Sequence, residues 1–132
     1  MSSRSLDDLD RRMQPLARSF VAACEAAGID LLVTCTLRSN DEQAKLYAQG
    51  RSTSGVIATN ARPGTSAHNF GLAMDVVPLI NGKPYWNFTR RDPTWSKIGE
   101  LGQAAGLQWL GAPGSEFLEG AHFQMKDWRG LL

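Results

Sequence analysis

The sequence predicts a single domain of the α+β class, spanning residues 1–132. Amphipathic segments with helical spacing alternate with apolar runs that are too short for helices. Glycine makes up 13 of the 132 residues, which favours many turns over a plain helical bundle. A chain of this length can bury a useful core without disulfides or other staples.

Two segments have clear helical periodicity. Residues 5–28 carry apolar side chains at spacings of three and four, and Ser5 can cap the start while Gly28 is a natural end. Residues 95–105 have a similar apolar side, with Gly106 at the end. Both are expected to be packing elements.

A further helix is expected after the first apolar run. Ser39 or Asn40 can cap it, and Gly50 ends it. Residues 51–66 are rich in Ser, Thr, Gly, Asn and Pro, which predicts a long loop. Loops of that length in a compact domain are often functional.

Short apolar runs predict the strands. Residues 31–36 indicate a buried strand, residues 72–77 a second one, and residues 123–125 the start of the last one. The Asn81-Gly82 pair is a strong signal for a hairpin turn. Residues 111–120 read as a turn-rich loop.

Charge and hydropathy exclude some function classes. The formal net charge is +1, so bulk electrostatics do not recruit nucleic acid or a membrane surface. No apolar stretch is long enough to span a membrane, and the polar N-terminal segment lacks the apolar core of a secretory signal. We therefore expect synthesis in the cytoplasm, with another component delivering the protein to any substrate outside it.

The two cysteines, Cys24 and Cys35, are expected to be free buried thiols. A disulfide between them stays open, because sequence cannot supply the geometry that a disulfide needs. They are not spaced as a CxxC pair, so a thiolate zinc site is not expected.

The chemistry concentrates around the only two histidines, His68 and His122. With Asp75 they form two imidazoles and a carboxylate, the kind of ligand set that catalytic zinc sites use while leaving a fourth position open. Gly71 lies between His68 and Asp75 and can supply the bend that turns both side chains to one side. Satisfied structural histidines and an ordinary capping aspartate are the alternative.

Glu119 precedes His122 by three residues and could act as a general base without binding the metal. Zinc lowers the pKa of a bound water to about 7, so a nucleophile would be available at neutral pH. Glu116 is a competing candidate for the base, and a solvated loop glutamate is the bland alternative. Arg38, at the end of the first strand, could hold a carbonyl or stabilise an oxyanion, or could form an ordinary surface ion pair.

Substrate contacts are expected from three further residues. Gln43 could hydrogen-bond substrate amides, or could be an exposed helix residue. Ser66 could contact the substrate, and Ser66 or Asn69 could orient a metal ligand. Of the four tryptophans we expect Trp109 to line a cleft, because it precedes the loop that leads to Glu119.

Three motifs resemble the zinc peptidase family of D-alanyl-D-alanine carboxypeptidases and dipeptidases, the VanY and VanX type, and the L-alanyl-D-glutamate endopeptidases of bacteriophage endolysins. The pattern S-x-H-x-x-G-x-A-x-D matches at Ser66, His68, Gly71, Ala73 and Asp75, and E/D-x-x-H matches at Glu119 and His122. An upstream segment matches at Arg38, Ser39, Gln43, Leu46, Tyr47, Gln49 and Gly50. Together they cover roughly residues 30 to 125.

The resemblance implies His68, Asp75 and His122 as zinc ligands, Glu119 as the catalytic base and Arg38 as the group that polarises the scissile carbonyl. It implies a small antiparallel sheet flanked by helices, the fold shared with DD-peptidases and the Hedgehog signalling domain. The implied substrate is the stem peptide of peptidoglycan, cut at L-Ala–D-Glu by a monomeric phage endolysin that a holin releases to the periplasm or cell wall.

Alternatives stay open at this point. A D-alanyl-D-alanine carboxypeptidase would use the same site, and a non-catalytic wall-binding module or a phage tail component would use the same fold. The chain also departs from its endolysin relatives, which often carry a Gly-Gly pair after the tryptophan and an acidic residue after His-Phe. Here the segments read Trp109-Leu110-Gly111-Ala112 and His122-Phe123-Gln124.

Overall fold

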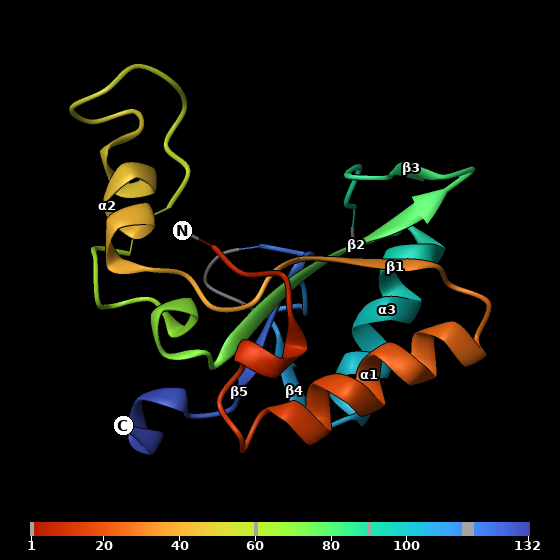
Figure 1. The fold of residues 1–132 in the computed structure, drawn as a ribbon. Helices are drawn as coiled ribbons and strands as arrows, with labels where there is room; N and C mark the ends of the chain where they lie inside the picture. Colours follow the sequence, from red (N-terminus) through yellow and green to blue (C-terminus); the bar gives the residue numbers. More distant parts are fainter. Residues whose placement is uncertain (1, 60, 90, 115–117) are drawn as a thin grey trace.

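The computed structural model describes residues 2–59, 61–89, 91–114 and 118–132. In these segments three α-helices accompany a five-stranded antiparallel sheet (Figure 1), which confirms the predicted α+β class. The helices are α1 (Gln14–Ala26), α2 (Asn40–Ala48) and α3 (Pro93–Ala104). The strands are β1 (Leu31–Cys35), β2 (Ala73–Ile80), β3 (Lys83–Pro84), β4 (Leu107–Trp109) and β5 (His122–Met125). Short 3₁₀ turns are η1 (Leu6–Asp8), η2 (Ala67–Phe70) and η3 (Trp128–Leu131).

The central strand of the sheet carries the predicted carboxylate ligand. The strand order is β1-β2-β5-β4, and β3 pairs with the far end of β2. The register places Asp75 of β2 opposite Cys35 of β1 on one side and opposite His122 of β5 on the other. Three residues with reactive side chains therefore lie in one row across neighbouring strands.

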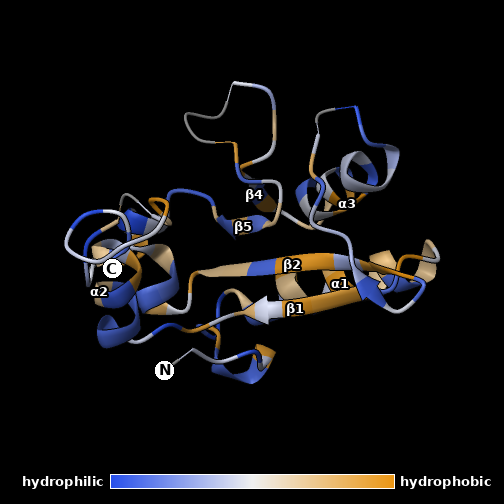
Figure 2. Ribbon diagram, turned by 90° about the horizontal axis from the view of Figure 1, so that it is seen from above, coloured by the Kyte–Doolittle hydropathy of each residue, from blue (hydrophilic) through white to orange (hydrophobic). Residues whose placement is uncertain are grey.

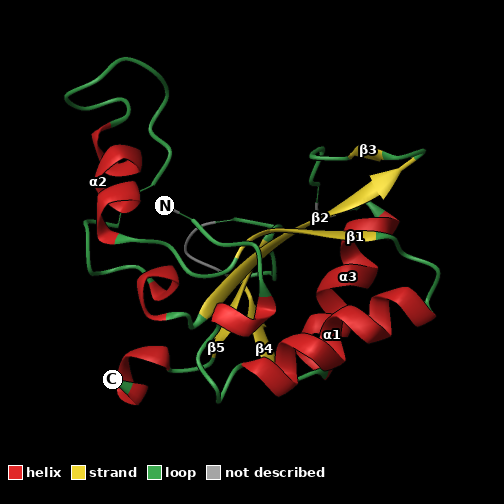
Figure 3. Ribbon diagram, in the orientation of Figure 1, coloured by secondary structure: helices red, strands yellow, loops and turns green. Residues whose placement is uncertain are grey.

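Helices α1 and α3 pack on one face of the sheet, whereas α2 lies apart beyond the end of β1 (Figure 3). Figure 2 shows α1 beneath the paired β1 and β2, whose ribbons are largely hydrophobic. Met74 and Val76 are fully buried in the core with Phe20 of α1 and Ile98 of α3. Successive strand residues point to opposite faces, so Asp75, between those two, points away from the helices.

The first predicted helix, 5–28, is wrong over residues 5–13. The chain forms η1, breaks, and starts α1 only at its Pro15-containing first turn. Proline inside a longer helix would lack an N–H and would clash with the preceding turn, so it is tolerated only at the start. At the break, the Asp10 N–H donates to the Gly71 carbonyl at 2.9 Å, which ties this segment to η2.

Most other predicted boundaries are confirmed. Ser39 caps α2, its Oγ accepting from the Glu42 N–H at 3.1 Å. Asn81 and Gly82 form the hairpin turn with φ of 53° and 76°. Strand β2 runs three residues beyond the predicted end, and α3 begins two residues early because Asp92 caps it.

The two cysteines are free and buried, as expected, so no disulfide links them. Among the helices of the described segments, none is long and apolar enough to cross a membrane.

Candidate active site and metal centre

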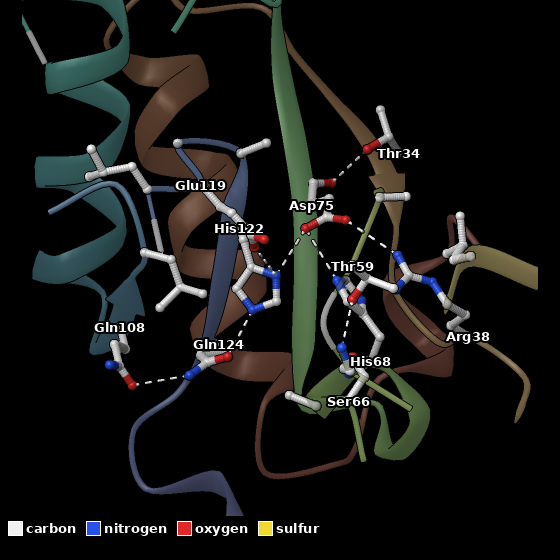
Figure 4. A pocket seen from close by; sticks show the side chains of 18 of the residues that line it. Thr34, Arg38, Thr59, Ser66, His68, Asp75, Gln108, Glu119, His122 and Gln124 are labelled. Carbon is white, nitrogen blue, oxygen red and sulfur yellow. Dashed lines mark hydrogen bonds and ion pairs between the residues drawn. The ribbon is translucent and has the colours of Figure 1, made fainter. Parts of the chain in front are cut away.

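Asp75 is the centre of a cluster that contains every predicted metal ligand (Figure 4). Its Oδ1 atom lies 3.2 Å from His68 Nε2 and 3.2 Å from His122 Nδ1. Its Oδ2 atom lies 3.6 Å from Arg38 Nη2. The carboxylate is therefore oriented with one oxygen toward the histidines and the other toward the guanidinium.

The 3₁₀ turn η2 brings His68 to this position. Ser66 and Asn69 form a reciprocal capping box at its start, and Gly71 ends it in the left-handed conformation with φ 68°. This reversal lets the loop histidine and the strand carboxylate face the same side, as the sequence predicts for Gly71. A Cβ atom at Gly71 would lie 2.9 Å from the backbone nitrogen of Asp10, so the close approach requires glycine.

A backbone carbonyl fixes the orientation of the His68 ring. The Nδ1 atom lies 3.0 Å from the carbonyl oxygen of Thr36. A carbonyl only accepts hydrogen bonds, so Nδ1 carries the proton and the lone pair of Nε2 points at Asp75. Nε2 is buried and makes no hydrogen bond within the described chain. The Thr36 carbonyl had no signal in the sequence, because backbone groups look alike in every residue.

A side chain does the same for His122. Its Nε2 atom lies 2.8 Å from Oε1 of Gln124, so Nε2 donates and the Nδ1 lone pair faces Asp75. His68, His122 and Asp75 thus direct three acceptor atoms toward one another. Such an arrangement requires a proton or a cation between them, and two imidazoles with one carboxylate suit Zn²⁺. The residues present therefore fit a zinc ion.

The electrostatics of the cluster agree with a bound positive charge. Burial lowers the pKa of His68, but the Asp75 carboxylate outweighs this effect and raises that pKa to about 10. Burial also raises the pKa of Asp75, whereas the imidazoles of His68 and His122 hold it well below its usual range. A metal would take the place of the proton that this pair otherwise retains.

Cys35 is an unexpected neighbour of the site. Its Sγ atom lies 3.6 Å from His68 Nδ1 and 3.6 Å from Arg38 Nη2. Ligand atoms of Cys35, His68 and Asp75 all lie within 4.8 Å of one another. The thiol faces the ring nitrogen that is bound to the Thr36 carbonyl, so the set with His122 matches the free lone pairs better. No cysteine motif in the sequence marks this contact, because Cys35 and His68 are far apart in the sequence and come together only when the chain folds.

Glu119, the predicted general base, lies at the edge of the cluster. Its Oε2 atom lies 3.8 Å from His122 Nδ1, and its side chain is 49% exposed. It lines the same cavity as the three candidate ligands. The competing candidate Glu116 lies outside the described residues.

Arg38 lines the cavity, but Gln43, which was predicted to bind substrate, does not. Gln43 is fully buried; its Oε1 accepts from Arg38 Nη1 at 2.9 Å and its Nε2 donates to the Ala61 carbonyl at 2.7 Å. The first turn of α2 points this side chain inward, where it braces the guanidinium. Gln43 is therefore a positioning residue for Arg38.

The cavity over the cluster has a volume of about 1080 Å³. Ser66 lies on its wall, as predicted, and its Oγ accepts from the His68 N–H at 3.3 Å. Trp109 is placed differently from the prediction: it is 8% exposed, stacks on Phe123 and donates from Nε1 to the Gly120 carbonyl. Trp109 therefore belongs to the core, whereas Trp86, which is half exposed, lines the cavity.

Comparison with known proteins agrees with this geometry. Residues 7–117 match the family described as VanY, D-alanyl-D-alanine carboxypeptidase. The chain belongs to the VanY family. It is also 33% identical, over 124 residues, to the peptidoglycan L-alanyl-D-glutamate endopeptidase CwlK of Bacillus subtilis (strain 168), a match that covers 89% of this chain and 74% of CwlK.

Solved structures share the fold of this VanY-family chain. The L-Ala D-Glu endopeptidase ChiX of Serratia marcescens superposes with a TM-score of 0.70 at 21% identity, covering 99% of this chain and 92% of ChiX. A D,D-pentapeptidase VanY of a VanB-type vancomycin resistance cassette, solved with Zn(II), gives a TM-score of 0.62 at 19% identity over 89% of this chain and 72% of that one. At these identities the likeness shows the fold alone.

Proposed function

We propose that this chain is a zinc-dependent peptidase of peptidoglycan that hydrolyses the L-Ala–D-Glu bond of the stem peptide. One observation carries the hydrolytic role: a half-exposed carboxylate, Glu119, borders a set of three converging ligand atoms at a cavity. The choice of bond is supported by the similarity to CwlK, which is named for that bond.

In this proposal His68, Asp75 and His122 hold the zinc ion. Bound zinc supplies a Lewis acid for the scissile carbonyl and lowers the pKa of the attacking water. Arg38 keeps Asp75 oriented through Oδ2 and stands on the cavity wall, where its guanidinium donates to the carbonyl oxygen as negative charge develops.

Glu119 moves the protons. Its carboxylate accepts a proton from the attacking water and later donates it to the nitrogen of the leaving amine. The 49% exposure of its side chain leaves it free to turn toward a substrate in the cavity. A general base does not have to coordinate the metal, and at 3.8 Å from His122 Glu119 stands beside the ligand set.

The test is digestion of purified peptidoglycan with the zinc-loaded protein, followed by mass spectrometry of the fragments. We expect glycan-linked stems that end in L-Ala and released peptides that begin with D-Glu. Loss of a single terminal D-Ala would instead establish the carboxypeptidase activity for which the VanY family is named. Zinc binding with no change in the peptidoglycan would favour a wall-binding module.

We also propose that the protein works as a monomeric bacteriophage endolysin, made in the host cytoplasm and released to the wall by a holin. The motif resemblance to that branch supports this role. Expression in a bacterial host with and without a holin tests it: lysis is expected only with the holin, and lysis that does not depend on a holin would contradict it.

A further inference from the structure

Two glutamine side chains form a relay behind His122 (Figure 4). Gln124 lies two residues after His122 on β5, so both side chains point to the same face. Gln124 Oε1 accepts from His122 Nε2 at 2.8 Å, and Gln124 Nε2 donates to Oε1 of Gln108 at 3.2 Å. Gln108 is the direct cross-strand partner of Gln124 on β4.

The direction of this relay decides which nitrogen of His122 carries the proton. A primary amide offers an acceptor at one end and donors at the other, and the wrong end against His122 would select the opposite tautomer. Gln108 presents an acceptor to the amide nitrogen of Gln124, so the amide oxygen faces the imidazole. Nε2 then holds the proton, and the Nδ1 lone pair remains on the side of Asp75.

We infer that Gln124, oriented by Gln108, is the positioning residue that holds His122 in the metal-binding tautomer. The inference rests on the zinc centre proposed above and is independent of which peptide bond is cleaved. Removal of a hydrogen-bond partner behind a metal ligand typically costs about 10- to 100-fold in metal affinity. We expect that range for loss of the Gln124 amide.

A structural role in the sheet does not account for the relay. The β4–β5 ladder is already formed by backbone pairing at Leu107–Met125 and Trp109–Phe123. Gln108 is exposed and Gln124 is only partly buried, so neither side chain fills the core. Replacement of either amide should therefore leave the fold intact.

The relay is neutral, whereas a carboxylate at the same place would make the imidazole more basic. Gln124→Glu keeps an acceptor against His122 Nε2 and adds negative charge, so it should restore the tautomer and bind zinc at least as tightly as the wild type. Gln124→Leu keeps the approximate shape and removes the acceptor. These two variants separate the hydrogen bond from the bulk of the side chain.

The experiment combines zinc affinity, measured by competition with a chelator, with two-bond ¹H–¹⁵N correlation spectra of the metal-free protein. The chain has only two histidines, so both imidazoles can be assigned. We expect Gln124→Leu to lose about 10- to 100-fold in zinc affinity and the Nε2–H preference of His122, with a smaller loss in Gln108→Leu. Gln103→Leu, at an exposed position of α3, is the matched control and should behave as wild type.

Wild-type zinc affinity and an unchanged His122 tautomer in Gln124→Leu would overturn this inference alone. Failure of the wild-type chain to bind zinc would overturn the metal centre and the inference together. Should Gln124→Leu fail to fold, Gln108→Leu decides: a His122 tautomer and zinc affinity identical to wild type would contradict the relay.

Discussion

The two candidate histidine ligands are held in different ways. His68 lies in the turn η2, where the Thr36 carbonyl fixes its ring through Nδ1, so that the lone pair of Nε2 points toward Asp75. His122 lies on β5, where the Gln124 side chain fixes its ring through Nε2, so that the lone pair of Nδ1 points toward Asp75. The two rings meet edge to face with centroids 5.0 Å apart.

The difference shows where the site is robust and where it can be tuned. No side-chain substitution removes the Thr36 carbonyl, so the orientation of His68 depends on the backbone path of β1 and η2. One substitution at Gln124 changes the environment of His122. The orientation of His68 should therefore be lost only when the backbone of η2 is disturbed. The orientation of His122 should instead change when a single neighbouring side chain is replaced.

The largest effect should follow from removal of a ligand. We expect His68→Ala to lose stoichiometric zinc because Nε2 supplies one of three converging ligand atoms. His122→Ala should retain weaker residual binding, since Cys35, His68 and Asp75 remain clustered. Metal content after dialysis measures both, and full zinc retention in His68→Ala would contradict its assignment as a ligand.

The next largest effect should come from a change in the backbone of η2, which positions His68 but not His122. Gly71→Ala puts a Cβ atom 2.9 Å from the Asp10 nitrogen at φ 68°, which strains η2 by about 1–3 kcal/mol. Zinc affinity should fall along with the unfolding free energy in urea. Gly82→Ala is the matched control, because it has φ 76° but nothing within 4 Å. Equal zinc affinities in the two variants would show that the η2 backbone does not control the site.

A smaller effect should come from the support of Arg38. Gln43→Leu removes the 2.9 Å hydrogen bond to Nη1, so the guanidinium loses its fixed position while the zinc ligands stay. We expect turnover to fall roughly tenfold, about 1.4 kcal/mol in activation free energy, at unchanged zinc content. Gln103→Leu, at an exposed position of α3, should leave turnover unchanged. Wild-type turnover in Gln43→Leu would show that Gln43 does not position Arg38 for catalysis.

The smallest effect should be on the pH dependence of the unfolding free energy, through Asp92, which lies away from both histidines. Burial raises the pKa of Asp92, but hydrogen bonds from the Tyr85 hydroxyl and from the Trp95 and Thr94 backbone outweigh it and lower that pKa. A lowered folded-state pKa stabilises the protein above the unfolded value, near 3.8, and the stabilisation is lost as pH falls through the folded pKa. Between about pH 5 and pH 2 the wild type should lose more stability than Asp92→Asn, which keeps the cap without the titration. Parallel stability curves in urea melts would contradict this.

The sequence identified the three residues that the structure brings together, because residue type and spacing carry that information. His68, Asp75 and His122 could be named, and the bend at Gly71 could be argued from its freedom at positive φ. The break of the first helix was missed although Pro15 was visible, because the apolar stripe on both sides of it continues the helical period.

Other parts of the site depend on contacts between distant segments. Gln43 was expected to face substrate but is buried. The burial was missed because sequence does not show which face of α2 turns inward. Trp109 packs in the core for a similar reason. The Thr36 carbonyl and the Cys35 thiol reach His68 only after β1 pairs with β2, so no local pattern marks them.

In the proposed mechanism Glu119 acts as the base beside a zinc ion that it does not hold. The most direct measurement is turnover of peptidoglycan per bound zinc in Glu119→Gln, with zinc content determined on the same preparation. We expect one zinc per chain and nearly complete loss of turnover, since an amide cannot accept the proton from water. Full turnover in this variant, or loss of its zinc, would show that Glu119 is not the base.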